Sequence, residues 1–426
     1  MIITALVITI FITGYLAISL EHTLQLNKAA SALITGVLCW TLFTIQPENK
    51  HIASEQLLHH LGEIASILFF LLGAMTIVEL IDSHNGFDII TRMIKTSKKS
   101  TLLLIVATLT FFLSALLDNL TTAIVMTSLC AKILSEKEDR LWFAGMIIIA
   151  ANAGGAWSPL GDVTTTMLWI GGQITALNIM KQLILPSMAV CILPALIIAY
   201  RFKGKLINTI TLKANTIEEK RDGKIILISG IGFLMFVPIF KTITHQPPFM
   251  GMLLAIGLIW VIITLLHKNK DKDEVANYTV TKALEKIDTP SILFFLGILL
   301  AVSALQSFGI LKEMADMLST VLKNDFLIGA ALGLLSAIVD NVPLVAASQG
   351  MYDLSTYPTD HSFWEFLALT TGTGGSAIII GSAAGVAVMG IEHIDFMWYL
   401  KKITWLALIG FAAGIAVFLL QTCLES

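Results

Sequence analysis

Long apolar segments, separated by short polar stretches, run through the whole chain of 426 residues. Many of these segments reach the roughly 20 residues that a helix needs to cross a lipid bilayer. The segments are expected near residues 2–20, 29–46, 64–82, 101–131, 141–171, 183–200, 225–240, 250–266, 290–306, 326–350, 363–390 and 400–421. This pattern predicts an all-α polytopic membrane protein.

The composition agrees with this fold class, because 56% of the residues are hydrophobic and only 13% are charged. A soluble domain carries about 25% charged residues. The lipid bilayer is therefore the expected partner, and nucleic-acid binding has no support in the sequence. The first apolar segment has no basic region before it and no small-residue cleavage site, so we interpret it as a span and not a signal peptide. The bacterial inner membrane is the simplest location for such a chain.

Basic residues in the loops predict the orientation of the chain in the membrane. The loops at 84–100, 201–224 and 267–288 hold most of them and should face the cytoplasm. All three fall on one side only if the segments at 101–131 and 326–350 enter the membrane and return as re-entrant hairpins. Ten true spans then remain, and both termini lie outside.

Three short sequence patterns of the first half recur in the same order in the second half. They are SILFFL (66–71 and 291–296), SALLDNL with SAIVDNV (114–120 and 336–342), and a glycine pair with a third glycine six residues on (154–161 and 374–381). The orientation makes the two halves inverted, an architecture typical of secondary transporters. We expect two inverted five-span repeats, 1–200 and 225–426, each with one re-entrant hairpin and one discontinuous helix. The cytoplasmic connector 201–224 joins them into one membrane domain.

Polar residues inside the apolar segments indicate an ion site. Each half carries an Asp-Asn pair in its hairpin, and a carboxylate at the bilayer centre costs roughly 2.5–3.5 kcal/mol. Carboxylate, amide and hydroxyl oxygens are the ligands that small hard cations prefer. The predicted Na⁺ ligands are Asp118, Asn119, Asp162, Asp340 and Asn341. The wider set of residues expected to bind cations and protons adds Thr121, Thr122, Asn152, Ser158, Thr164, Thr373 and Ser376.

The two halves differ at Asp162, which corresponds to Ser382 in the second half. Three aspartates would together cost about 8–10 kcal/mol at the bilayer centre, so cation binding or protonation must offset much of this cost. In a medium of low dielectric constant, protons and metal cations compete for carboxylates near neutral pH. Such competition is the minimal mechanism of a cation/proton antiporter. The alternative role for the aspartates is to cap helix N-termini, and capping can coincide with coordination.

Other functions find less support in the sequence. The stretch TGTGGS at 371–376 is similar to a phosphate-binding loop, but it follows an apolar helix instead of a strand. An enzyme would need a nucleophile with its base or a set of metal ligands, and the apolar segments contain neither. No cofactor is expected beside the transported Na⁺, Li⁺ and H⁺. The alternative function is an arsenite or organic-anion carrier, but no Lys, Arg or His falls inside the predicted core.

At these residues the chain resembles the NhaD-type sodium/proton antiporters of the ion transporter superfamily. That superfamily also contains arsenite exporters, citrate–metal carriers and dicarboxylate/sodium symporters. The motifs that carry the resemblance are SALLDNLTTAIVM (114–126), NAGGAWSPLGDVTTT (152–166) and Asp340-Asn341 with 371–376. The resemblance implies exchange of intracellular Na⁺ and Li⁺ for external H⁺. It also implies a homodimer in which a transport domain moves against a scaffold like an elevator.

Overall fold

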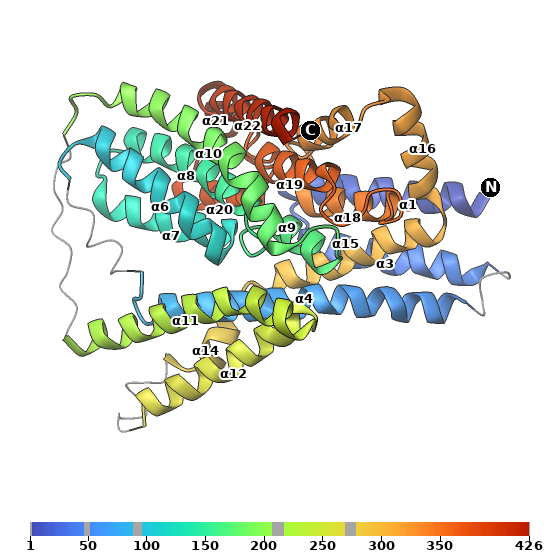
Figure 1. Cartoon of the computed structure of the whole chain (residues 1–426), viewed down its shortest axis with the longest axis horizontal. Helices are drawn as coiled ribbons and strands as arrows, with labels where there is room; N and C mark the ends of the chain where they lie inside the picture. Colours follow the sequence, from blue (N-terminus) through green and yellow to red (C-terminus); the bar gives the residue numbers. More distant parts are fainter. Residues whose placement is uncertain (1, 47–51, 88–95, 207–216, 269–277, 426) are drawn as a thin grey trace.

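The computed structural model describes residues 2–46, 52–87, 96–206, 217–268 and 278–425 (Figure 1). Over these ranges the chain is helical and forms no strand, apart from one isolated bridge between Lys98 and Leu206. Nine helices within the same ranges are long and apolar enough to cross a membrane, or ten if the bent pair α16 and α17 counts as one span. The expectation of an all-helical polytopic membrane protein is confirmed at this level.

The first half contains α1 (Ile2–Ser19), α2 (Glu21–Leu24), α3 (Lys28–Ile45), α4 (Ala53–Ser83), α6 (Lys99–Leu117), α7 (Asn119–Ile133), α8 (Lys137–Ala156), α9 (Val163–Ile170) and α10 (Ala176–Arg201). The second half contains α11 (Ile217–Thr244), α12 (Pro248–Leu266), α14 (Val280–Lys286), α15 (Thr289–Ser307), α16 (Ile310–Leu322), α17 (Asp325–Leu335), α18 (Asn341–Met351), α19 (Ser362–Gly374), α20 (Ala383–Glu392), α21 (Phe396–Lys402) and α22 (Thr404–Glu425).

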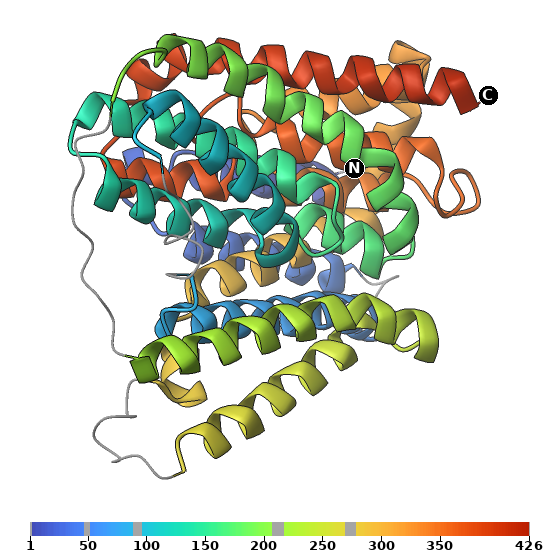
Figure 2. The same ribbon diagram turned by 60° about the vertical axis from the view of Figure 1, so that its left-hand side comes forward.

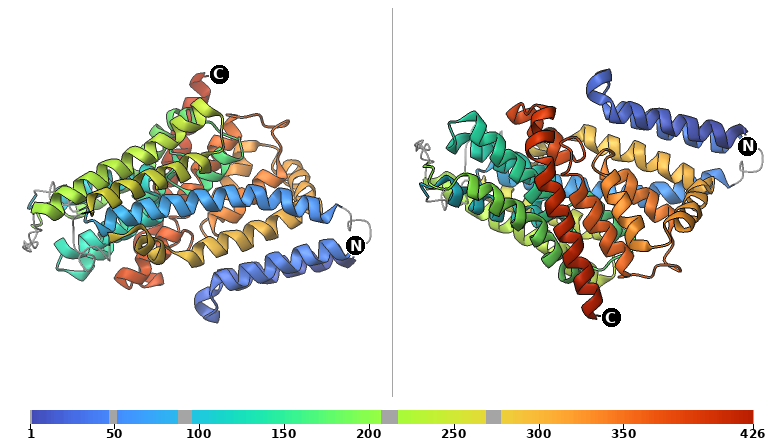
Figure 3. Two further views of the ribbon diagram at one scale, coloured as in Figure 1. Left: turned by 90° about the horizontal axis from the view of Figure 1, so that it is seen from below. Right: turned by 90° about the horizontal axis from the view of Figure 1, so that it is seen from above.

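The helices form two groups that meet along one face (Figures 1 and 2). In one group α3 packs along α15, while α4 packs against α11, α12 and α14. The other group contains α6 to α10 together with α17 to α20 and α22. The helix α1 belongs with α3 and lies at one edge of the molecule (Figure 3). Contacts of α15 with α18 and of α4 with α9 join the two groups.

The outer surface carries large apolar side chains that water would solvate poorly. On α12, for example, Leu254, Leu258 and Val261 are 41–56% exposed, and α1 buries only Val7 and Ile18. Such surfaces suit lipid tails, and a helix also pairs its own backbone N–H and C=O groups where no water is present. The protein is thus a multi-pass membrane protein.

The described parts of the three predicted cytoplasmic loops contact one another, so they lie on the same side of the protein. Lys98 pairs with Leu206, which joins the loops 84–100 and 201–224. The rings of His84 and His267 stack with their centroids 5.4 Å apart, which joins the first loop to the third. The basic residues Arg92, Lys95 and Lys213 of these loops lie outside the described residues.

The apolar segment at 101–131 is interrupted at Asp118, where α6 ends and α7 begins. The start of α6 lies next to the residues that follow α7, because Lys99 Nζ is 3.6 Å from Glu136 and 2.5 Å from Asp139. In the second half the apolar segment at 326–350 is interrupted between α17, which ends at Leu335, and α18, which begins at Asn341. The chain also bends by 114° between α16 and α17. The apolar pattern did not predict α16, whose mixture of apolar and charged residues is too polar to suggest a span.

Candidate functional site

Four helices begin around one narrow cavity, and each begins at a polar side chain that caps its N-terminus. The capped helices, with their caps, are α7 (Asp118), α9 (Asp162), α18 (Asp340) and α20 (Ser382). The cavity has a volume of about 60 Å³, and its lining includes Asp118, Asn119, Asp162, Asp340 and Asn341. The five residues that the sequence suggested as Na⁺ ligands therefore surround one space.

The carboxylate of Asp162 lies at the centre of this arrangement and is 2% exposed. Its Oδ2 atom accepts hydrogen bonds from the amides of Asn119 (2.7 Å) and Asn341 (3.4 Å). Its Oδ1 atom accepts from the backbone N–H (2.9 Å) and the hydroxyl (2.7 Å) of Thr164. One carboxylate of the first half thus accepts hydrogen bonds from both halves of the chain.

A third buried amide, that of Asn152 of α8, extends the network. Its Oδ1 accepts a hydrogen bond from Asn119 at 3.1 Å, and its Nδ2 donates to Ser376 and Ser382, both at 2.9 Å. Because these groups are buried, each needs the partners that the network supplies. The network therefore links α7 and α8 of the first half to the break between α19 and α20 of the second.

Asp118 adopts an unusual backbone conformation, with φ 85° and ψ 156°. This region is populated almost only by glycine, and an aspartate there costs on the order of 1–3 kcal/mol. Both carboxylate oxygens bond to Thr121, Oδ1 to its N–H and Oδ2 to its hydroxyl, each at 2.8 Å. The equivalent residue Asp340 has an ordinary φ of −48°. Of the two Asp-Asn pairs only the first carries this strain, and it marks Asp118 as a candidate functional residue.

Equivalent small residues let the helices of each half approach closely. A Cβ atom on Gly154 would lie 2.2 Å from the carbonyl oxygen of Phe111, and one on Gly374 would lie 2.0 Å from that of Gly333. The hydroxyls of Ser114 and Ser336 likewise donate to the carbonyls of Ala151 (2.6 Å) and Thr371 (3.0 Å). Positions that match in sequence thus make matching contacts in the two halves.

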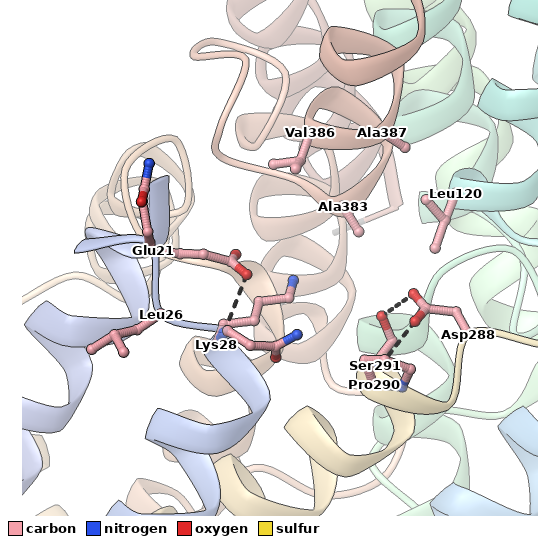
Figure 4. Close-up of a pocket in the computed structure, with 12 residues that line it drawn as sticks. Glu21, Leu26, Lys28, Leu120, Asp288, Pro290, Ser291, Ala383, Val386 and Ala387 are labelled. Carbon is pink, nitrogen blue, oxygen red and sulfur yellow. Dashed lines mark hydrogen bonds between the residues drawn. The ribbon is translucent and has the colours of Figure 1, made fainter. Parts of the chain in front are cut away.

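A wider vestibule adjoins the narrow cavity, and Figure 4 shows the residues that line this vestibule. Its volume is about 680 Å³, and Glu21 and Asp288 lie in its lining. Four residues line both spaces, namely Lys28, Leu120, Ser291 and Ala383. The vestibule and the narrow cavity therefore adjoin at these four residues.

One basic residue lies in the core, contrary to the sequence prediction. Lys28 Nζ is 3.9 Å from Asp340 Oδ2, and the two side chains are 24% and 20% exposed. Lys28 directly precedes the apolar segment 29–46 and was not predicted to lie near the aspartates. The loop before α3 instead lies beside the broken helices. The packing of α3 along α15 positions this loop, and the apolar pattern of the sequence gave no sign of it.

The chain matches the CitMHS family, described as "Citrate transporter", over residues 6–372. It is 47% identical over 412 residues to "Sodium/proton antiporter 1" of Arabidopsis thaliana, covering 96% of this chain and 71% of the relative. It is 31% identical over 440 residues to "Na(+)/H(+) antiporter NhaD" of Vibrio cholerae, covering 96% of this chain and 90% of the relative.

The chain belongs to the NhaD-type sodium/proton antiporter family. The resemblance noted in the sequence is thereby confirmed, and so is the expectation of a transporter instead of an enzyme. The relatives include proteins of a plant as well as of bacteria. A bacterial inner membrane for this NhaD-type chain stays a prediction.

Three of the predicted site residues do not line the cavity of this NhaD-type protein, and their side chains make no described hydrogen bond to its aspartates. The hydroxyl of Ser158 donates to the carbonyl of Ala115, and that of Thr373 donates to Leu369, both at 2.6 Å. Thr122 is buried, and its hydroxyl has no hydrogen-bond partner among the described residues. None of the three lines either cavity as far as the described part of the chain shows. Hydroxyl chemistry alone did not reveal which way these side chains face.

The three aspartates do not form one compact acidic cluster. Over the ranges that the structure describes, no three Asp, Glu, His or Cys side chains lie close enough to hold a metal ion together. Any cation here would need oxygen ligands from amides, hydroxyls or the backbone beside a carboxylate.

Proposed function

We propose that the protein exchanges Na⁺, and also Li⁺, for H⁺ across its membrane, by competition at the cavity lined by Asp118, Asp162 and Asp340. Relatives over nearly the whole chain carry the name sodium/proton antiporter. The single observation that supports this site best is the contact of Asp162 with amides from both halves, at 2.7 and 3.4 Å. The carboxylate of Asp162 thus joins the two halves of the chain at one site.

The contacts favour different tasks for the three aspartates. Four donors already face the carboxylate of Asp162, so its first task is to orient the amides. An amide that donates through its nitrogen leaves its oxygen available to a cation. In this proposal Asn119 and Asn341 offer oxygens to Na⁺, while Asp118 and Asp340 supply the charge. These two carboxylates are partly exposed, so a cation or a proton can reach them.

We also propose the inverted duplication, with halves 1–200 and 225–426 joined by the connector 201–224. The matching caps, glycine contacts and serine hydrogen bonds support it. The proximity of Lys99 to Glu136 supports a first hairpin that returns to the side from which it entered. The group of α3, α4, α11, α12 and α15 would be the scaffold, and the group of broken helices would move like an elevator. The homodimer stays a prediction.

In this orientation the vestibule opens toward the cytoplasm. Asp288 of its lining follows α14, and Lys286 of α14 contacts Glu79 near the end of α4 at 3.0 Å. That end of α4 leads into the loop 84–100, which the sequence predicts to be cytoplasmic. The aspartates would then be accessible from the inside, as the loading of intracellular Na⁺ requires.

An organic-anion carrier is the second candidate. The matching family is described as "Citrate transporter", and four helix N-termini meet at the cavity. Helix N-termini attract anions. Three of the four N-termini are capped by aspartates, however, and these carboxylates would repel an anionic substrate. The charges at the cavity therefore favour a cation.

The experiment that tests the site is the replacement Asp118→Asn, assayed by Na⁺-dependent proton movement in everted vesicles. Asparagine caps a helix about as well as aspartate, so the variant should fold. We expect it to lose exchange with Na⁺ and Li⁺, because the carboxylate charge is gone. Full activity would reduce Asp118 to a cap and overturn its proposed role.

The matched control is Asp395→Asn, because Asp395 caps α21 on an exposed turn and lines none of the described cavities. This control should exchange ions normally. The same vesicles are then given arsenite and citrate. Flux with either anion, without a response to Na⁺, would favour the second candidate.

A further inference from the structure

Lys28 is held where the vestibule and the narrow cavity join. It lines the vestibule, the narrow cavity and a third space that extends from Asp340 toward Tyr15. Within the described residues that line these three spaces, it is the one basic side chain. Figure 4 shows it extending from the start of α3 toward Ala383. Any cation that moves between the vestibule and Asp340 passes this ammonium group.

The ammonium group of Lys28 has two partners rather than one. Its Nζ lies 3.9 Å from Asp340 Oδ2 and 4.6 Å from the centroid of the Phe294 ring. The first distance is longer than a direct hydrogen bond, so the pair is loose. The aromatic face attracts a cation as well. Lysine carries its compact charge on a flexible stem, so the ammonium group can move between the two partners.

The backbone at Lys28 is anchored by a hydrogen bond at the start of α3. Its N–H donates to the carboxylate of Glu21 at 3.2 Å, which holds the start of α3 in place. The other acids around the side chain are Asp288 in the vestibule and the two aspartates of the first half in the narrow cavity. No second cation competes for Asp340 in the described lining.

We propose that Lys28 is a built-in counter-ion of Asp340 that competes with Na⁺ for its carboxylate. When no ion is bound, the ammonium group neutralises Asp340. When Na⁺ arrives, the ammonium group withdraws toward Phe294, and it returns when Na⁺ leaves. Lys28 is then a specificity-determining residue that weakens Na⁺ binding and speeds Na⁺ release. This inference rests on the proposed exchange of Na⁺ at the aspartates.

The test is Lys28→Met, assayed for the apparent KM for Na⁺ and the maximal rate of exchange in everted vesicles. Without its competitor, Na⁺ should bind about tenfold more tightly, which corresponds to about 1.4 kcal/mol. The KM should fall, and the maximal rate should fall with it because release is slower. Lys28→Arg keeps the charge and should stay near the wild type in both values. A purely structural role would raise the KM or leave it unchanged, and either result overturns the proposal.

The matched control is Lys181→Met, since Lys181 is an exposed lysine paired with Glu425 at 3.7 Å and should leave both values unchanged. Lys28→Gln is the second variant, and the Na⁺-dependent rise in thermal stability of the purified proteins measures binding without transport. Both uncharged variants should be stabilised at lower Na⁺ than the wild type. If neither folds, Lys28 is structural and the proposal is wrong. Absence of Na⁺ exchange in the wild type would instead refute the proposed function.

Discussion

The side-chain amide of Asn119 donates a hydrogen bond to the carboxylate of Asp162 over 2.7 Å, although 43 positions separate the two residues. The amide of Asn341 reaches the same oxygen from the second half at 3.4 Å. Asp162 is the acid that the second half replaces by Ser382. This unpaired acid is therefore the acceptor that both halves share, and it is the natural place to test how the halves cooperate.

Replacing Asp162 with asparagine should reduce the apparent Na⁺ affinity at least about tenfold. The two asparagine amides would lose a charged acceptor, and hydrogen bonds to a charged group are roughly twice as strong as neutral ones. The misplaced amides would then present their oxygens poorly to Na⁺. The measurement is the Na⁺ concentration that gives half-maximal proton movement in everted vesicles.

The control for that variant is Asp353→Asn, on an exposed loop where asparagine can make the same turn. It should behave like the wild type. An Asp162→Asn variant with unchanged Na⁺ dependence would show that the network needs only a polar side chain at this position.

Gly154→Ala and Gly374→Ala should each disrupt the protein to a similar degree. A Cβ atom at either position would come within 2.2 Å of a backbone carbonyl oxygen that belongs to the neighbouring helix. Overpacking of this kind costs about 1–3 kcal/mol, because whole helices must shift. The effect is measured as a lower melting temperature in lipid nanodiscs and as lost exchange activity.

Gly257→Ala is the matched control, since no atom lies within 4 Å of a Cβ atom built there. Alanine at this position should preserve or slightly raise stability, because alanine favours helix. If only one of Gly154→Ala and Gly374→Ala had an effect, the two halves would not be packed in equivalent ways.

Glu392→Gln should lower thermal stability while leaving the ion site intact. Glu392 is 5% exposed and accepts a hydrogen bond from Arg140 Nε at 3.0 Å, which ties α20 to α8. Loss of a hydrogen bond between charged groups costs about 1.5–3 kcal/mol. The melting temperature of the purified protein should fall, and the KM for Na⁺ should stay the same.

Glu138→Gln provides the comparison, because Glu138 pairs with Arg201 at 2.9 Å while 68% exposed. A surface pair contributes about 0–1 kcal/mol, so this variant should melt close to the wild type. If Glu392→Gln and Glu138→Gln lowered the melting temperature equally, burial would not increase the contribution of the Arg140–Glu392 pair to stability.

The amino-acid sequence by itself determined that the chain is a multi-pass helical membrane protein and which residues interrupt its apolar segments. This was possible because lipid imposes simple rules. A span needs about 20 apolar residues. A carboxylate inside a span is energetically costly, so its presence there indicates a function. The interruption at Asp118 and the pairs Asp118-Asn119 and Asp340-Asn341 followed from these rules alone.

Only the tertiary structure decided which of these groups meet. It joined Asp162 to an amide of the other half, turned the hydroxyls of Ser158 and Thr373 toward backbone carbonyls, and placed Lys28 beside Asp340. These outcomes depend on how helices pack across long sequence separations, and a hydropathy pattern carries no information on such pairings. The hydropathy pattern indicates the cost of placing a polar group in lipid. Which partner that polar group has is decided by the geometry of the folded chain.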